Sequence, residues 1–279
     1  MTDATPRSGS PEALGGAVAG RDDGAIVSFT QPPVVEVVCG VQFGLLPLAT
    51  AHFGRFWDAV SDAYPHTRDL PPLATLIEAP PGQVGSASVQ WSNLPELRRV
   101  FFLNLEKGRL LQLQADRFHA NWQKLPDGDA YPRFPEVFGE FHRRWKEFVD
   151  FVHKEGLPEP QVVQAELLYI NAIPLTDAGL PFPRIIPWLQ PPPVAFAAPP
   201  EAEASLHFEV GEIRGRLHVA ARTVRLAEGL RVLVLELTAR GAVGDDGLEA
   251  WFAAARRTVV ESFAEFTSEE AQRAWGRTR

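Results

Sequence analysis

Residues 34–43, VVEVVCGVQF, place Val35, Val37, Cys39, Val41 and Phe43 on one side and Val34, Glu36, Val38 and Gln42 on the other. One side of the alternation is apolar and the other carries Glu36 and Gln42, which predicts a β-strand with one buried face. Residues 49–64 and 133–155 instead repeat aromatic and aliphatic side chains at a helical spacing. That spacing predicts two amphipathic helices.

Further strands are predicted where short β-branched or aromatic runs are bounded by turn residues. They cover residues 73–77, 87–91, 99–106, 109–116, 162–171, 205–210, 216–224 and 230–239. Lys107-Gly108 joins two of them as a tight hairpin, because glycine supplies the positive φ that such turns need. A last helix is predicted over 247–275, and the Pro-rich stretch 174–200 is expected to hold one or two helical turns at 183–189.

The order of these elements indicates an α+β fold, in which long helices pack on one face of an antiparallel sheet. Strand, helix, strands and long helix follow one another in residues 32–158. The same plan recurs in residues 159–279, with a Pro-rich crossover in place of the first helix. We therefore expect two similar halves within one compact unit. Residues 1–31 have no periodicity and few large apolar side chains, and we expect them to be a disordered tail.

The side of the strands that faces away from the predicted core is rich in amide and imidazole groups. Its residues are Glu36, Gln42, Gln112, Gln114, Asp116, Gln164, Glu166, His207, Glu209, Arg216, His218 and Arg222. Antiparallel sheets often leave one face in water, so a plain solvated face is one interpretation. A binding surface and a catalytic or metal site are the other two.

Two clusters of polar and aromatic residues lie beside predicted strands. The first, in the link at 111–134, comprises Asp116, Arg117, His119, Asn121, Trp122, Tyr131 and Arg133. In the second, Tyr169 and Asn171 share one face of a strand and Glu166 points to the other. Either the clusters complete one polar pocket, or they are a structural corner and a strand end.

The overall charge limits the partners that this chain can attract. A net charge of −8 argues against general affinity for nucleic acids or anionic membranes, because both reward an excess of Lys and Arg. The single cysteine, Cys39, cannot form an internal disulfide and is expected to be a buried strand residue. The first residues do not read as a secretory signal, and no apolar run is long enough to span a bilayer. We expect a cytoplasmic protein without a membrane or nucleic-acid partner.

The sequence carries no motif of established chemistry. It has no GxGxxG after a strand, no GxxxxGK[ST], no HExxH, no GxSxG and no CxxC. We therefore expect no cofactor and no bound metal. A metal held by His207, His218 and a carboxylate would require neighbouring strands to bring these groups together.

Four segments carry a resemblance to known proteins: PPVVEVV at 32–38, LQADRFHANW at 113–122, YPRF at 131–134 and ELLYIN at 166–171. Together they resemble a sporadically distributed bacterial and archaeal protein family, which is defined by sequence and has no assigned activity. The resemblance covers most of residues 32–276, and His119 is not part of the family pattern. It implies no catalytic residues. Patchy distribution is typical of accessory, mobile or defence-related genes, which favours such a role.

The leading hypothesis is a non-enzymatic binding or accessory protein that engages a protein partner or a small ligand through its polar sheet face. Its candidate binding residues are Asp116, Arg117, Asn121, Trp122, Tyr131, Arg133, Glu166, Tyr169, Asn171, His207, His218 and Arg222. One alternative is an enzyme for a small polar substrate, with Glu166 or Asp116 as base and His207 or His218 assisting. Another is a structural homodimer formed through the polar face.

Overall fold

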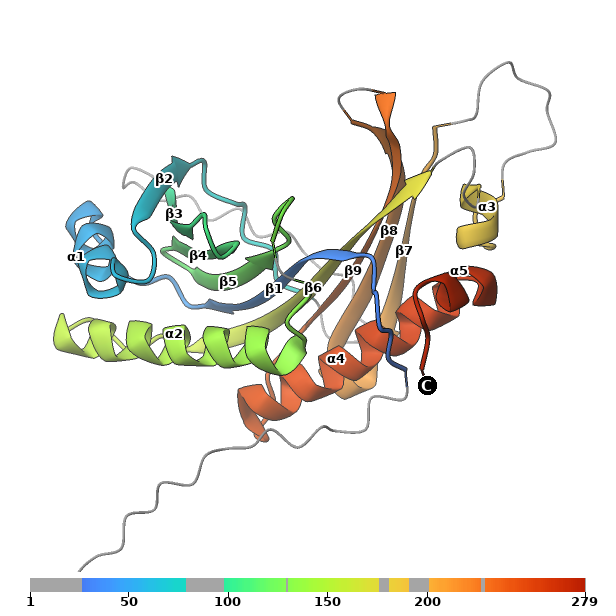
Figure 1. The fold of residues 1–279 in the computed structure, drawn as a ribbon. Coiled ribbons are helices and arrows are strands. Elements are labelled where there is room, and N and C mark those ends of the chain that lie inside the picture. The colour runs from blue at the N-terminus through green and yellow to red at the C-terminus, as the bar shows by residue number, and fades with distance from the viewer. Residues whose placement is uncertain are drawn as a thin grey trace, which may run out of the picture.

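A computed structural model describes residues 27–78, 98–128, 130–175, 181–190, 201–226 and 229–278. Within these residues, one antiparallel sheet has the strand order β2-β3-β4-β5-β1-β6-β9-β8-β7 (Figure 1). The strands are β1 (Val34–Phe43), β2 (His66–Leu70), β3 (Arg99–Asn104), β4 (Arg109–Gln114), β5 (Arg117–Gln123), β6 (Val162–Leu175), β7 (Glu203–Val210), β8 (Gly215–Arg225) and β9 (Arg231–Gly241). The helices are α1 (Thr50–Val60), α2 (Phe134–Lys154), α3 (Phe182–Ile185), α4 (Gly247–Phe266) and α5 (Glu269–Ala274). The predicted α+β fold with an antiparallel sheet is confirmed.

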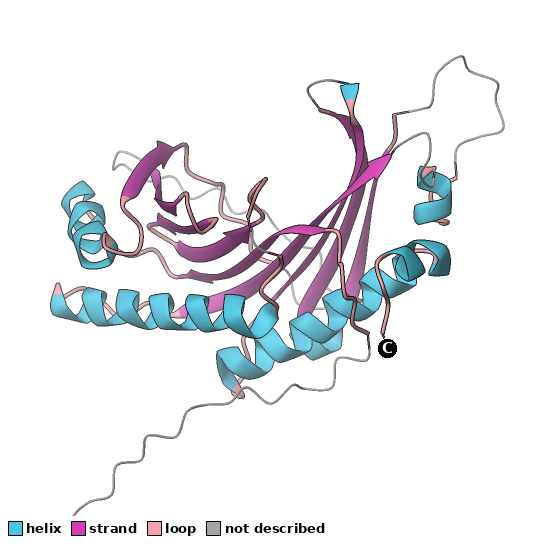
Figure 2. Ribbon diagram, viewed as in Figure 1, coloured by secondary structure: helices cyan, strands magenta, loops and turns pink. Residues whose placement is uncertain are grey.

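The long helices α2 and α4 lie side by side against the same face of the curved sheet, and its concave face turns away from them (Figures 1 and 2). The apolar side of each strand forms the core against these helices. Phe118 on β5, for example, stacks on Phe148 of α2 with ring centroids 5.4 Å apart. Burial of such aromatic pairs stabilises this layer. Over the described part of the chain, none of the helices has the length and apolarity needed to cross a membrane.

The segment after β4 was predicted to be a link, and this was wrong. It turns at Ala115-Asp116 and returns as β5, which pairs with both β4 and β1. The alternation of β5 is regular, with Phe118, Ala120 and Trp122 toward the helices. The other side of β5 is polar but buried. Hairpins at the edge of a sheet usually expose their polar side, and this segment does not. Strand β2 also went unpredicted, and the predicted strand at 87–91 lies outside the described residues.

Residues 73–77 do not form the predicted strand. They are extended but pair with no strand, and they cross the concave face of the sheet as part of a segment that we call the strap (Leu73–Glu78). The backbone of the strap bonds to side chains of the sheet instead of to a neighbouring strand, for example where Leu73 N–H donates to Gln114 Oε1 at 2.9 Å.

Two other predicted boundaries also differ from the structure. The last helix is interrupted at Thr267, whose extended backbone separates α4 from α5, and the Ser268 hydroxyl then caps α5. Residues 27–31 are not disordered, although we assigned them to the tail at 1–31. Phe29 is buried, and its carbonyl accepts a 2.8 Å hydrogen bond from Arg133. Burial of its large apolar ring opposes the entropy that the chain loses by ordering. The rest of the tail lies outside the described residues.

Candidate functional site

The concave face carries polar side chains in rows that cross several strands. Pairing places Gln112 opposite His119 and Gly40 opposite both His119 and Glu166. Glu166 in turn lies opposite Arg240, and Arg240 opposite Arg216. Because directly opposed side chains on one face are neighbours, this row brings together groups from β4 to β8. It is the central row of the candidate site.

The glutamines of this face hold the strap. Gln164 donates from Nε2 to the Leu76 carbonyl at 2.6 Å, and its Oε1 accepts from the Glu78 N–H at 3.0 Å. Gln114 makes the same two-sided contact with the backbone of Leu73, at 2.9 Å in each direction. A carboxamide has a donor and an acceptor, so it can replace the missing strand partner of an extended segment. This accounts for two of the amides on the face, and a plain solvated face is wrong for its central part, where the amide side chains are buried.

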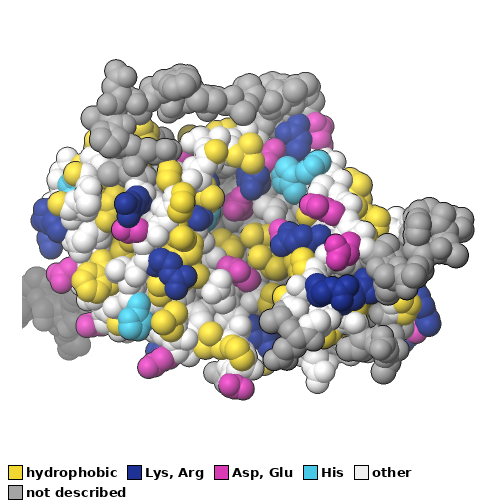
Figure 3. All heavy atoms as spheres, turned by 90° about the horizontal axis from the view of Figure 1, so that it is seen from above, with side chains coloured by type: hydrophobic (Ala, Val, Ile, Leu, Met, Phe, Trp, Pro, Cys, Tyr) yellow, Lys and Arg dark blue, Asp and Glu magenta, His cyan; other side chains and the backbone are white. Residues whose placement is uncertain are grey.

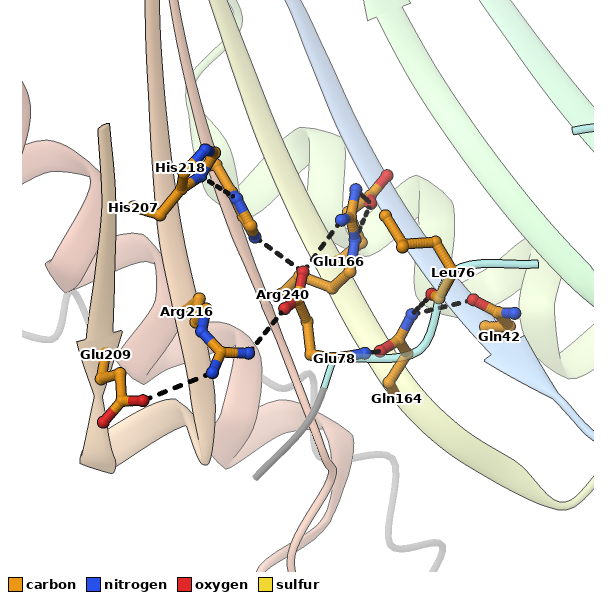
Figure 4. A network of polar contacts seen from close by, with 10 residues as sticks. All are labelled: Gln42, Leu76, Glu78, Gln164, Glu166, His207, Glu209, Arg216, His218 and Arg240. Carbon is orange, nitrogen blue, oxygen red and sulfur yellow. Dashed lines mark hydrogen bonds and ion pairs between the residues drawn. The ribbon is translucent and has the colours of Figure 1, made fainter. Parts of the chain in front are cut away.

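The end of the strap is anchored by the carboxylate of Glu78 (Figure 4). Glu78 Oε1 lies 2.7 Å from His218 Nε2 and accepts from Arg240 at 3.1 Å, while Oε2 accepts from Arg216 at 3.2 Å. Burial alone would raise the pKa of Glu78, but His218, Arg216 and Arg240 outweigh it and lower the pKa to about 2. The carboxylate therefore stays charged at neutral pH.

Two further contacts extend this cluster. Arg240 Nε donates to Glu166 Oε2 at 2.6 Å, and His207 Nδ1 lies 2.6 Å from His218 Nδ1. In this contact one Nδ1 donates and the other accepts, so the accepting Nδ1 carries no proton. The two imidazoles are therefore not both protonated at both nitrogens. Burial would raise the pKa of Glu166, yet Arg240 and other cations lower it. Glu166 is thus a fixed anion and a weak base.

His119 occupies the middle of the central row, and its ring lies over Gly40. A methyl group on Gly40 would clash with the ring, reaching 2.8 Å from Nε2. Burial and the nearby cations of Arg117, Arg240 and Arg99 lower the pKa of His119 to about 4, although Glu166 opposes them. Within the described residues neither ring nitrogen has a hydrogen-bond partner, although only 8% of the residue is exposed. His119 is therefore a neutral imidazole with an unused donor and an unused acceptor.

Arg99, on β3, lies beside the central row, two residues before Phe101, which is the residue opposite Gln112, and is the second group with unused capacity. Its NH1 donates to Gln112 Oε1 at 3.2 Å and its guanidinium lies over the Phe101 ring. Its Nε atom is buried without a hydrogen-bond partner, and no ion pair among the described residues joins Arg99 to a carboxylate. Burial and the charge of Arg117 lower the pKa of Arg99. This cation has no counter-charge of its own.

The floor beside these groups is apolar. Val38, Leu168 and Ile170 lie on the concave side of β1 and β6, and the last two are partly exposed. Figure 3 looks onto this face and shows basic, acidic and histidine side chains around an apolar centre. A small apolar area with a few converging polar groups is a usual setting for ligand binding.

The structure divides the twelve predicted site residues between the two faces of the sheet. Those on the concave face, or at its turn, are Asp116, Arg117, Asn121, Glu166, His207, His218 and Arg222. Those on the helix side are Trp122, Tyr131, Arg133, Tyr169 and Asn171. Members of both sequence clusters meet on the helix side, where Tyr131, Arg133, Tyr169 and Asn171 line one cavity, whereas the other predicted residues lie away from it on the concave face. The first cluster is itself split, because alternate residues of β5 point to opposite faces.

On the concave face the predicted residues are not all in one network. Asp116 accepts from Arg117 at 3.3 Å and from Thr75 of the strap at 2.8 Å. Asn121 bridges Gln112 and Glu36. Arg222 pairs with Glu236 at 2.7 Å, farther along the strands than His218. The enzyme alternative is weakened here, because Asp116 and Glu166 are each held by an arginine.

Sequence reasoning missed several members of the site. Gly40 and Glu78 carry no pattern of their own, and Arg240 lay beyond the predicted end of its strand at 239. His119 is part of the first cluster and alternates with Phe118 and Ala120, but it is not among the candidate binding residues. Arg99 follows Arg98 and precedes an apolar run, so no alternation marks it. No group of three or more His, Cys, Asp or Glu in the described residues is arranged to hold a metal ion.

Comparisons of the chain with protein-family models, with curated proteins and with solved structures found no match. The proposals below therefore rest on the geometry of the site.

Proposed function

We propose that the protein is a binding protein that takes up a small oxyanion, a carboxylate or a phosphate, on the concave face of its sheet. The anion lies between Arg99, Arg117 and His119, and the apolar floor of β1 and β6 lies on the other side of the His119 ring. The observation that carries this proposal is the Nε atom of Arg99, which is buried, cationic and without a partner. An unpaired buried donor on a charged group is costly, and a bound anion removes that cost.

The local charges support this choice. Arg117 is paired with Asp116, and Arg240 with Glu166 and Glu78. These pairs leave Arg99 as one uncompensated positive charge near His119. Guanidinium groups offer planar pairs of donors that match carboxylate and phosphate oxygens.

The state of His119 supports it as well. A neutral imidazole can donate one hydrogen bond to an anion without placing a further buried charge in the site. An anion bound beside the ring would also stabilise its protonated form. Binding of the anion is therefore expected to raise the pKa of His119, and this rise can be measured at that residue.

The ion-paired states of Glu78 and Glu166 fit a binding protein better than an acid–base enzyme. The Glu78–His218–His207 chain has the geometry of a relay, but Glu78 is neutralised by two arginines and fastens the strap. We infer that its role is to hold the face in shape. A carboxylate is a more efficient general base when its pKa lies closer to the working pH, and the pKa values of Glu78 and Glu166 are instead lowered.

Titration with inorganic phosphate and with acetate, followed by NMR at low ionic strength, tests the proposal. We expect shifts at His119 and Arg99, a rise in the pKa of His119 with bound anion, and about a tenfold loss of affinity in Arg99→Gln. Arg98→Gln is the matched control, because Arg98 is exposed and pairs with Asp69. The anion that binds more tightly shows whether the site prefers a phosphate or a carboxylate.

Absence of shifts at His119 and Arg99 with both anions would overturn the proposal, as would equal losses in Arg98→Gln and Arg99→Gln. The other form of the binding hypothesis is that this face engages a protein partner. Capture experiments with the immobilised protein test it. A mass measurement in solution tests the homodimer.

We also propose that the chain arose by internal duplication and acts as a cytoplasmic accessory protein of the family it resembles. The sheet order supports the duplication, because β1 and β6 are adjacent at its centre and β5-β4-β3 mirror β9-β8-β7 on either side. A helix follows each group, α2 in one half and α4 in the other. Separate expression of 32–158 and 159–279 tests whether each half contains a folding unit.

A further inference from the structure

A partly open cavity lies on the opposite side of the sheet from the anion site. It has a volume of about 90 Å³ and is lined by residues of β1, β6, β9, the start of α2, the second half of α4 and residues 27–32. Most of its wall is apolar and includes Val34, Leu237, Val259 and Phe263. The volume equals that of roughly three water molecules in the liquid, so it suits a ligand with few heavy atoms.

Two tyrosines on the wall have an unused hydrogen-bond donor. The hydroxyls of Tyr131 and Tyr169 are 2.9 Å apart, so one donates to the other. The proton of the accepting hydroxyl then has no partner among the described residues. Burial raises the pKa of both tyrosines, and both therefore remain protonated donors. A buried donor of this kind calls for an acceptor in the cavity.

A cation lies at the same wall. Arg256 of α4 lines the cavity, with its guanidinium over the Phe134 ring at 5.3 Å from the centroid. Among the described residues it has no carboxylate partner. The other arginine of the wall, Arg133, is already occupied, because it donates to the Phe29 carbonyl. Asn171 is likewise engaged, since its amide donates to the Leu235 carbonyl at 3.1 Å.

We propose that this cavity binds a short-chain carboxylate. The carboxylate accepts from the phenol pair and faces Arg256, while the hydrocarbon part lies against Leu237, Val259 and Phe263. Each half of such a ligand matches one part of the wall: the oxygens match the unused donor and the unpaired cation, and the methylene groups match the apolar surface. The proposal is independent of the anion site, which lies on the other face and has a polar surround.

Matched ligands of equal length test this assignment. Butanoate, butan-1-ol and n-butylamine differ in the head group alone, and methyl NMR signals of Leu237, Val259 and Val260 report entry into the cavity. We expect butanoate to bind about tenfold more tightly than butan-1-ol, and the amine to bind least. Equal binding of acid and alcohol would overturn the proposed head-group recognition. Unshifted methyl signals up to the solubility limit would overturn the site.

Variants locate the recognition. Arg256→Gln and Tyr131→Phe should each weaken butanoate binding several-fold and leave butan-1-ol binding unchanged. Arg257→Gln is the matched control, because Arg257 is the next residue of α4, is exposed and lies 3.9 Å from Glu212. Arg99→Gln, on the other face, should also leave butanoate binding at this cavity unchanged. If Arg256→Gln binds butanoate as tightly as Arg257→Gln, Arg256 does not recognise the carboxylate and the proposal fails.

Discussion

The imidazole of His119 lies directly over Gly40 of the neighbouring strand, where a methyl group would come within 2.8 Å of Nε2. Gly40→Ala should therefore force the ring from its buried position and destabilise the fold by about 1–3 kcal/mol. Urea unfolding measures the loss. Gly139→Ala is the control, since a Cβ there meets nothing within 4 Å in the exposed middle of α2. It should stabilise the protein by about 0.5–1 kcal/mol.

The double variant Gly40→Ala/His119→Ala separates the clash from other effects of the alanine. Its destabilisation should be smaller than the sum of the two single variants, because removal of the ring removes the clash. If the losses of stability are additive, the missing side chain of Gly40 does not serve to make room for the His119 ring.

The low pKa of His119 makes stability depend on pH. The unfolded chain binds a proton near pH 6.5, whereas folded His119 binds one only near pH 4. Stability is therefore fully present above pH 6.5 and falls as the pH drops through this window, by up to about 3 kcal/mol. Urea unfolding at several pH values should show that His119→Gln lacks this loss. His66→Gln, at an exposed position of β2, should keep the pH dependence of the unaltered protein.

The sheet was predictable from sequence because most strands show one apolar side. Strand β5 was not recognised, although Phe118, Ala120 and Trp122 alternate with polar residues, because those polar residues are also buried and resembled a corner. The strap was wrongly predicted to be a strand because its sequence does not show that side chains, and not a neighbouring strand, bond to its backbone. Its extended backbone is satisfied by glutamine side chains, and Leu76 and Gln164, which meet there, are 88 residues apart in sequence.

The candidate site was predictable only as a list of polar residues on the strands. Which of them meet depends on register: Glu166 faces Arg240 because β6 pairs with β9, and no local pattern states that pairing. The assignment of Tyr169 and Glu166 to opposite faces followed from the period of a strand alone. Their separation into two sites required the positions of α2 and α4.

Glu78 provides a second pH-dependent contribution, at lower pH. Its folded pKa is about 2, compared with 4.5 in the unfolded chain. Its stabilising effect is present above pH 4.5 and is lost as the pH falls toward 2, by about 2 kcal/mol or somewhat more. At pH 7, Glu78→Gln should destabilise the protein by about 1–3 kcal/mol and speed proteolysis within the strap. Glu212→Gln, at an exposed carboxylate, is the control. Unchanged proteolysis in Glu78→Gln would show that the strap is held without this carboxylate.

The two ends of the Gln164 carboxamide can be tested separately by substitution. Gln164→Glu retains an acceptor for the Glu78 N–H but loses the donor to the Leu76 carbonyl, whereas Gln164→Leu loses both. Both variants should lose about 1–3 kcal/mol, because each leaves buried backbone groups without partners. Hydrogen exchange at the Glu78 amide distinguishes them, since it should accelerate strongly in Gln164→Leu alone. Gln161→Glu, at an exposed position before β6, should affect neither measurement. Equal protection of the Glu78 amide in Gln164→Leu and the unaltered protein would contradict the role of Gln164 as a substitute strand partner.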